Sequence, residues 1–185
     1  MEIKITTKLV LKILEILSWI LFAGLSVEAG AIIVNTFITL AINPQGVENF
    51  WEGKDYLPAL LRHDSGHFFA VTFIMIIVAV LKAIMFYVIL KFLAEKKLNM
   101  SQPFSRELRR FIATLAWLAL GIGLFSSYGY DYTKWLSKQG LALPNLQSLH
   151  IAGSDVWLFM AVILFVIAQV VKRGIEIQEE NSLTI

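Results

Sequence analysis

The chain has 185 residues, of which 57% are hydrophobic and 16% charged, and its mean hydropathy is +0.70. A soluble domain has about a quarter charged residues, so this composition excludes an ordinary soluble protein and indicates an all-helical integral membrane protein. The net charge of +2 is too small to indicate direct binding of nucleic acid, and the absence of cysteine excludes disulfides, thiolate metal sites and thiol nucleophiles.

Four apolar segments are long enough to cross a bilayer, which takes about 20 residues of helix. They lie at about 16–41, 68–93, 111–128 and 154–171. Asn43-Pro44 ends the first segment, because proline cannot continue a helix. Asp64 or Ser65 is placed to cap the second helix, and Ser105 the third. We therefore predict a single transmembrane domain over residues 1–185, an all-α four-helix bundle with an acidic tail at 172–185.

The positions of the basic residues predict how the chain is threaded. Eleven of the 16 Lys and Arg residues fall on one side of the four segments. That side holds Lys4, Lys8, Lys12, Lys91, Lys96, Lys97, Arg106, Arg109, Arg110, Lys172 and Arg173. Cytoplasmic loops are enriched in basic residues. We therefore expect both termini and the middle loop to be cytoplasmic, with two outer loops at roughly 43–67 and 129–153.

Two ionisable residues lie deep in the apolar segments. At ~1.5 Å per residue, Glu28 and Lys82 both fall roughly 17 Å from the inner boundary. An unpaired charge at that depth costs at least ~2.5–3.5 kcal/mol, so the matching depths and opposite signs predict a buried Glu28–Lys82 ion pair. Such a pair either fixes the register of two helices, which we favour, or forms part of a proton or ion pathway.

Small residues recur every four positions in two of the helices. Ser26 and Gly30 lie in the first, and Ala119, Gly123 and Ser127 in the third. Small residues let helices approach closely. We favour packing within one bundle, and the alternative is a face that forms a homo-oligomer.

Two histidines precede the second helix in the stretch RHDSGH. His63 and His67 flank Asp64, and two imidazoles with a carboxylate could bind zinc, with His150 and Asp155 completing the set. The simpler interpretation is helix capping and interfacial polarity. No nucleophile elbow, phosphate-binding glycine loop or paired-carboxylate motif is evident, so we expect no enzyme activity and no cofactor. A metal-dependent membrane enzyme is the weakest alternative.

The chain ends in GIEIQEENSLTI, in which apolar and polar residues alternate. Period-two spacing favours an extended segment, with Gly174 ending the fourth helix, although the polar run could instead prolong that helix by a turn or two. Glutamates are repelled by anionic lipid, so the tail either projects into the cytoplasm to bind a protein or only solubilises the helix end. The expected contact residues are Ile175, Glu176, Ile177, Glu179, Glu180, Leu183 and Ile185, with Phe104, Arg106 and Arg109 from the middle loop.

The ending GIEIQEENSLTI, the middle-loop stretch PFSRELRRF and the four-span layout resemble domain-of-unknown-function family 2975, a family of small bacterial membrane proteins. The resemblance implies a multi-pass protein of the bacterial cytoplasmic membrane. Members of the family are frequently encoded beside a very small helix-turn-helix regulator, which implies a cytoplasmic protein partner. Our leading hypothesis is therefore a membrane sensor or anchor that binds such a regulator, and the alternative is a small transporter or ion-permeable protein using Glu28 and Lys82.

Overall fold

The structure, a computed structural model, describes residues 7–51, 53, 55–95 and 104–182. The four long helices are α1 (Thr7–Phe37), α3 (Ser65–Ala94), α4 (Arg106–Ser137) and α5 (Ser154–Ser182), and a short helix α2 (Tyr56–His63) precedes α3. Each long helix is apolar enough to cross a membrane, and the described part of the chain contains no strand. The predicted all-α, four-helix membrane architecture is confirmed, and the chain is a multi-pass membrane protein.

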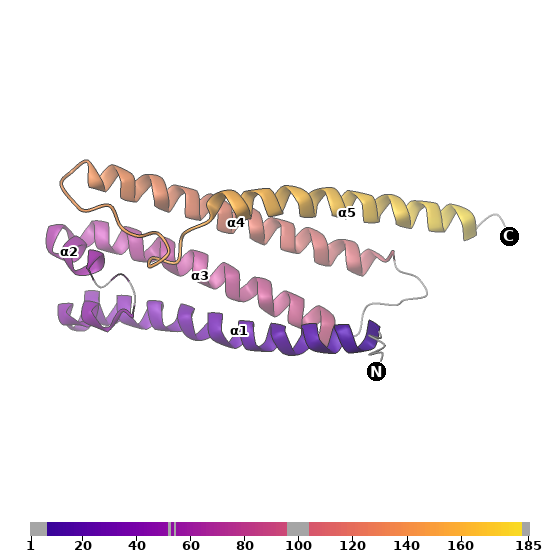
Figure 1. The fold of residues 1–185 in the computed structure, drawn as a ribbon, viewed down its shortest axis with the longest axis horizontal. Coiled ribbons are helices and arrows are strands. Elements are labelled where there is room, and N and C mark those ends of the chain that lie inside the picture. The colour runs from indigo at the N-terminus through magenta and orange to yellow at the C-terminus, as the bar shows by residue number, and fades with distance from the viewer. Residues whose placement is uncertain (1–6, 52, 54, 96–103, 183–185) are drawn as a thin grey trace, which may run out of the picture.

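The long helices pack in chain order (Figure 1). α1 packs against α3, α3 against α4, and α4 against α5, which places α1 and α5 on the two outer sides of the α3–α4 pair. Large apolar side chains remain exposed along both outer helices, for example Ile20 and Val27 on α1 and Val162 and Val170 on α5. Lipid is the solvent that such surfaces require.

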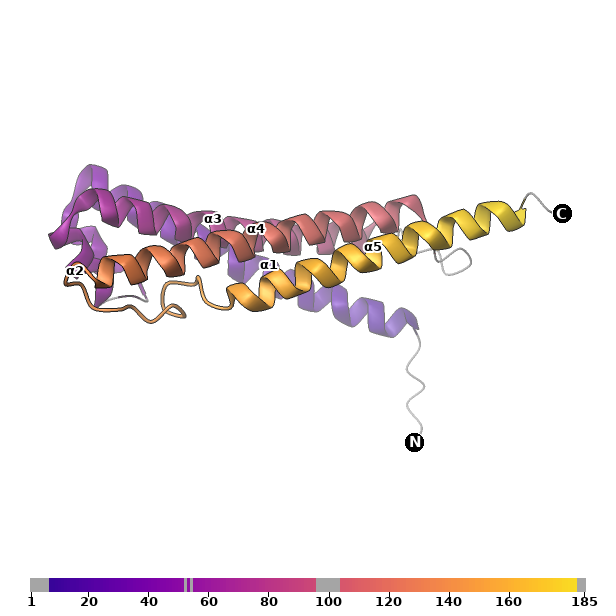
Figure 2. The same cartoon turned by 90° about the horizontal axis from the view of Figure 1, so that it is seen from above.

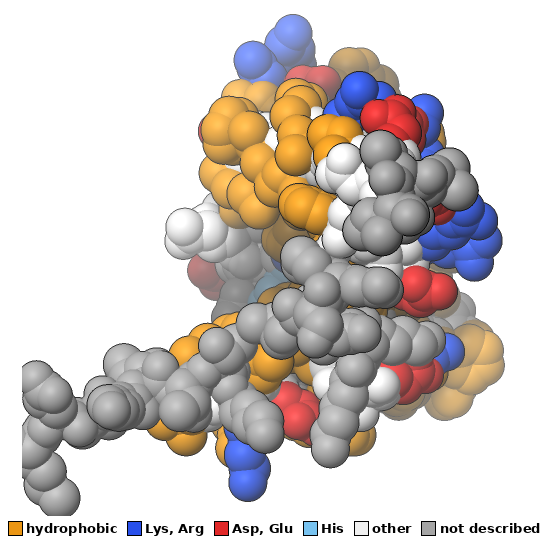
Figure 3. Space-filling view, turned by 90° about the vertical axis from the view of Figure 1, so that its right-hand side faces the viewer, with side chains coloured by type: hydrophobic (Ala, Val, Ile, Leu, Met, Phe, Trp, Pro, Cys, Tyr) orange, Lys and Arg blue, Asp and Glu red, His pale blue; other side chains and the backbone are white. Residues whose placement is uncertain are grey.

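The start of α1 and the end of α5 lie at one end of the molecule, which we name the termini end, and the opposite end is the loop end (Figures 1 and 2). Basic and acidic side chains gather on the termini end beside hydrophobic ones (Figure 3). The loop end contains α2 and the α4–α5 connector, residues 138–153. α1 continues there as a π-helix, Ile38–Ile42, followed by a 3-10 helix, Pro44–Asn49. The side chain of Asn43 accepts a hydrogen bond from the Gln45 amide at this break.

The α4–α5 connector folds back along the helices, so that α5 begins part-way along α4 (Figures 1 and 2). Leu149 and Ile151 are buried, and the side chain of Ile151 reaches the backbone of Gly129 on α4. The prediction of a loop at 129–153 is therefore corrected in its bounds and its packing, while its place on the outer side stays a prediction. Its first nine residues belong to α4, and the connector is packed into the molecule because its apolar side chains need burial.

Two helix caps predicted from the sequence are confirmed. A side-chain oxygen of Asp64 accepts a hydrogen bond from the backbone N–H of His67 at 2.9 Å, at the start of α3. The hydroxyl of Ser105 accepts from the backbone N–H of Leu108 at 3.1 Å, at the start of α4. Each cap satisfies one of the amides that a helix start leaves without an intrahelical partner.

The tail is helical rather than extended, which corrects the favoured interpretation of its alternating pattern. α5 passes through Gly174 without a break and ends at Ser182. Arg173 forms ion pairs with Glu176 at 2.9 Å and with Glu180 at 4.0 Å, and Ile175 packs against the termini end of α4. Lys172 also pairs with Glu176, four residues on, at 3.9 Å. Ion pairs three and four residues apart and a packed isoleucine stabilise a helix, and they outweigh the local cost of one glycine. Leu183 and Ile185 lie outside the described residues.

The small residues behave differently in the two helices. A Cβ atom on Gly123 would lie 2.7 Å from the side chain of Leu158 and 3.0 Å from its backbone nitrogen, so α4 and α5 approach each other closely at this point. Among the described residues, no atom of another part of the chain lies within 4 Å of the same position on Gly30. Packing within the chain therefore accounts for Gly123, whereas Gly30 lines an open groove between α1 and α3.

We expect Gly123→Ala to lower the free energy of unfolding by about 1–3 kcal/mol, the usual cost of inserting a methyl group into a packed interface. The backbone nitrogen of Leu158 cannot move aside without shifting α5. The measurement is unfolding of the purified protein in detergent micelles. Gly30→Ala is the matched control and should leave stability equal or slightly higher; equal effects of the two variants would contradict the close approach.

Candidate functional site

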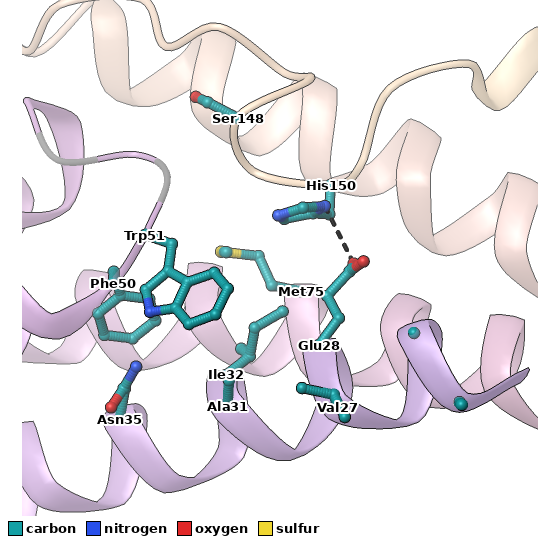
Figure 4. Close-up of a pocket in the computed structure, with 12 residues that line it drawn as sticks. Val27, Glu28, Ala31, Ile32, Asn35, Phe50, Trp51, Met75, Ser148 and His150 are labelled. Carbon is teal, nitrogen blue, oxygen red and sulfur yellow. Dashed lines mark ion pairs between the residues drawn. The ribbon is translucent and has the colours of Figure 1, made fainter. Parts of the chain in front are cut away.

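A cavity of about 550 Å³ lies between α1 and the segments of the loop end (Figure 4). One face of α1, from Ala23 to Asn35, forms one wall. The remaining wall consists of Phe50, Trp51, Met75, Ser148 and His150. Most of the wall is apolar, and the volume is within the roughly 300–1,000 Å³ of typical small-molecule sites.

A network that includes Glu28, Lys82 and His150 adjoins this cavity. His150 Nδ1 lies 3.0 Å from Glu28 Oε1 (Figure 4), and the Lys82 ammonium donates a hydrogen bond to the backbone carbonyl of His150 at 2.8 Å. The distance is that of a hydrogen bond in which an imidazole N–H donates and the carboxylate oxygen accepts. His150 therefore joins α1 to α3, using its ring on one side and its main chain on the other.

The backbone of His150 adopts a left-handed conformation with φ of 58°. For a residue other than glycine this conformation costs roughly 1–2 kcal/mol. The buried neighbours Leu149 and Ile151 fix the segment, as do the hydrogen bonds from the His150 amide to the Gln147 carbonyl and from the Ile151 amide to the Leu146 carbonyl. The connector is thus built to hold the imidazole and the carbonyl of one residue in place.

The sequence prediction for Glu28 and Lys82 needs one change. The structure brings both residues to one site, but their charged groups do not form a direct ion pair, and His150 lies between them. Sequence analysis placed His150 in an outer loop, where it could complete a zinc set, and so missed its contacts with Glu28 and Lys82. The available signal was the series of leucines and isoleucine that flank it, Leu141, Leu143, Leu146, Leu149 and Ile151, which is unusual in a loop exposed to water.

The histidines at the start of α3 form a different group. His67 Nδ1 lies 2.9 Å from the hydroxyl of Tyr132. The His67 ring packs edge-on against Trp135, with 5.6 Å between the ring centroids, and stacks with the His63 ring at 6.3 Å. The capping hydrogen bond from the His67 amide is the main cause that lowers the pKa of Asp64 below its usual range.

The candidate zinc set does not come together in the described residues. His150 contacts Glu28 instead of His63 and His67. No three His, Asp or Glu side chains gather as a metal site requires, within the part of the chain that the structure describes.

Tyr56, from α2, is buried at the loop end. Burial above all, with Tyr132 nearby, raises the pKa of Tyr56 to about 12, so its hydroxyl stays protonated.

The sequence matches one family of known proteins. Residues 22–185 match the family described as "Protein of unknown function (DUF2975)". The chain belongs to this family. No curated protein and no solved structure matches it. The matched residues include Glu28, Lys82, His150 and all of α5. Both the loop-end site and the C-terminal part of α5 therefore lie within the sequence that matches the family.

At the termini end of this DUF2975 protein, the two predicted partner-binding segments lie together. Arg106 forms an ion pair with Glu179 at 2.9 Å, and the ring of Phe104 covers Gly174. Arg109 and Ile177 are exposed, the latter by 45%. A groove of about 460 Å³ is lined here by Phe104, Val170, Arg173, Gly174, Ile177 and Gln178.

We expect Glu28→Gln and Lys82→Met to each lower the free energy of unfolding by about 1–3 kcal/mol, less than the 3–5 kcal/mol of a fully buried pair because the site adjoins an open cavity. Each substitution leaves one charge without its counter-charge in a low-dielectric region. The double variant removes both charges and should be closer to the native protein than the sum of the two single effects.

A double-mutant cycle from unfolding in mixed micelles measures this coupling. Glu48→Gln with Lys138→Met, at exposed positions of the loop end, is the control pair and should give no coupling. Strict additivity of the Glu28 and Lys82 effects would show that His150 does not connect the two charges.

Proposed function

We propose that this protein is a sensor or anchor of the bacterial cytoplasmic membrane that links the loop-end cavity to a small cytoplasmic protein through α5. The observation that supports this most is the continuity of α5. The helix begins at Ser154, four residues after His150, and runs without interruption to Ser182. At ~1.5 Å per residue, its 29 residues span ~43 Å.

The mechanical argument rests on how α5 is attached. Its first residues follow directly from the segment that holds His150, and Leu158 lies tightly against Gly123. A hydrogen-bonded helix moves as a unit, so a shift of the connector when the cavity is filled displaces the far end of α5. Coupling of this kind requires that the ligand favour one of two positions of the connector, since a ligand with equal affinity for both shifts nothing.

The basic residues support the orientation. Lys12, Lys91, Arg106, Arg109, Arg110, Lys172 and Arg173 lie in the parts of α1, α3, α4 and α5 nearest the termini end. Because positive residues are enriched on the cytoplasmic side, the termini end faces the cytoplasm and the cavity faces the outer leaflet. Beyond the ends of the other long helices, α5 projects toward the partner (Figures 1 and 2).

The chemistry of the projection favours a mixed apolar and charged contact. Glu176 and Glu179 already contact Arg173 and Arg106, so a basic partner surface would have to compete with these arginines. The exposed side chain of Ile177 and the groove beside it offer an apolar anchor instead. A small helix-turn-helix regulator, the partner that the family resemblance implies, would present both an apolar patch and basic residues.

We expect a photoreactive residue at Ile177 to capture one small cytoplasmic protein in cells, and Ile177→Asp to weaken binding of that protein by at least tenfold. The substitution places a charge in an apolar contact, which costs more than the loss of the isoleucine alone. The measurement is binding of the purified partner to the full-length protein in micelles.

Asn181→Asp adds the same charge one helical turn further on and should leave binding within about twofold. A chain ending at Arg173 should not bind. If that shortened chain recovers the partner as well as the full-length protein does, the tail has no part in the contact.

A small transporter is the second candidate, and one observation favours it. The side chain of Glu28 is 27% exposed and adjoins an open cavity, as a residue on a substrate pathway would. On this alternative, Glu28→Gln changes pH-dependent flux in proteoliposomes, with Glu48→Gln as the control. Native flux no greater than that of empty liposomes would remove transport from consideration.

A further inference from the structure

The carboxylate of Glu28 is short of hydrogen-bond donors. A carboxylate offers about four lone-pair positions. Within the described residues only His150 contacts it, and that contact uses Oε1. The second oxygen, Oε2, has no protein donor there, although the rest of the surrounding wall is mostly apolar. The Glu28 side chain is 27% exposed and lines the cavity, so Oε2 is open to an occupant that supplies a donor, and a charge deep in an apolar region is stabilised by such a partner.

The remaining wall sets the rest of the occupant's chemistry. Val27, Ala31, Ile32 and Met75 give an apolar surface beside Glu28. Phe50 and Trp51 lie at the other side of the cavity (Figure 4), and Trp51 is 83% exposed. A molecule that fills this space therefore needs an apolar body in addition to a donor at one end.

The charge of the donor follows from which ionisable groups face the cavity. Among the described residues, Glu28 and His150 are the ionisable groups that line it, whereas Lys82 does not line it and has its ammonium on the carbonyl of His150. A carboxylate or phosphate head would meet the like charge of Glu28 in a region of low dielectric, where repulsion is strong. An ammonium head meets the opposite charge and supplies three donors.

We propose that the loop-end cavity binds an amphipathic ammonium, with its head on Glu28 Oε2 and its apolar body between α1 and the Phe50–Trp51 side. This ligand would be the one that the proposed sensor detects, so its biological role rests on the proposed function. Binding of the ligand itself does not require the C-terminal part of α5. An ammonium of this kind can belong to a free alkylamine or to the headgroup of an aminophospholipid.

The test is a titration of the full-length protein in phosphatidylcholine nanodiscs with brominated dodecylamine, dodecanol and dodecanoate, followed by quenching of Trp51 fluorescence. Bromine quenches tryptophan at close range, and the Trp51→Phe variant gives the signal of the other four tryptophans for subtraction. We expect saturable quenching by the amine at concentrations at least tenfold below those needed for the carboxylate, with the alcohol in between.

Variants test the role assigned to Glu28. The double variant Glu28→Gln/Lys82→Met, which keeps the charges balanced, should lose at least tenfold in affinity for the amine, and Glu48→Gln should lose none. Ala31→Phe, which fills the cavity but keeps the carboxylate, should also abolish saturable quenching. Equal affinity for the amine and the carboxylate, or unchanged affinity in the Glu28 double variant, would overturn the proposal.

Two further arms separate the alternatives. In nanodiscs containing phosphatidylethanolamine, weaker amine binding identifies the lipid headgroup as the natural occupant, and unchanged binding identifies a free amine. Both results support an ammonium site. The chain ending at Arg173 should bind the amine as the full-length protein does, so a failure of partner binding at Ile177 leaves this inference standing, and a failure of amine binding leaves the partner contact standing.

Discussion

The need to satisfy two opposite charges within an apolar helix layer is the constraint on which this structure depends. Glu28 and Lys82 lie on neighbouring helices, and neither can remain alone in hydrocarbon without a large cost in free energy. The fold meets this need by inserting the connector between them, so that His150 contacts the carboxylate with its ring and the ammonium with its carbonyl. The position of the connector, the left-handed backbone at His150 and the late start of α5 all accompany that insertion.

The packing of the helices in chain order makes the same network important for α1. Among the long helices, α1 packs extensively only against α3, so most of its surface faces lipid. The contact between Glu28 and His150 gives α1 a second attachment, to a segment that is continuous with α5. One polar contact therefore connects the two outer helices of the layer, which otherwise have no extensive contact with each other in the described part of the chain.

The sequence predicted the architecture well, because hydropathy and caps are local signals. The four apolar segments, the break at Asn43-Pro44, and the caps Asp64 and Ser105 are all determined by residues close in sequence. The tail was harder, because Ile175 and Ile177 fit a period of two while the ion pairs of Arg173 fit a helix, and packing of Ile175 against α4 decided between them. The site was the hardest feature to predict, because Lys82 donates to a backbone carbonyl, and every residue has such a carbonyl whatever its side chain.

His150 binds Glu28 through its side chain and Lys82 through its backbone carbonyl, and this difference has an evolutionary consequence. A main-chain carbonyl exists whatever side chain is present, so Lys82 can keep its acceptor through any replacement at this position, whereas Glu28 depends on the imidazole. Glycine or asparagine would suit the left-handed backbone better than histidine does, yet neither would bring the same ring to α1. Among natural variants of this fold, the residue at 150 should therefore change together with the residue at 28 and independently of the residue at 82.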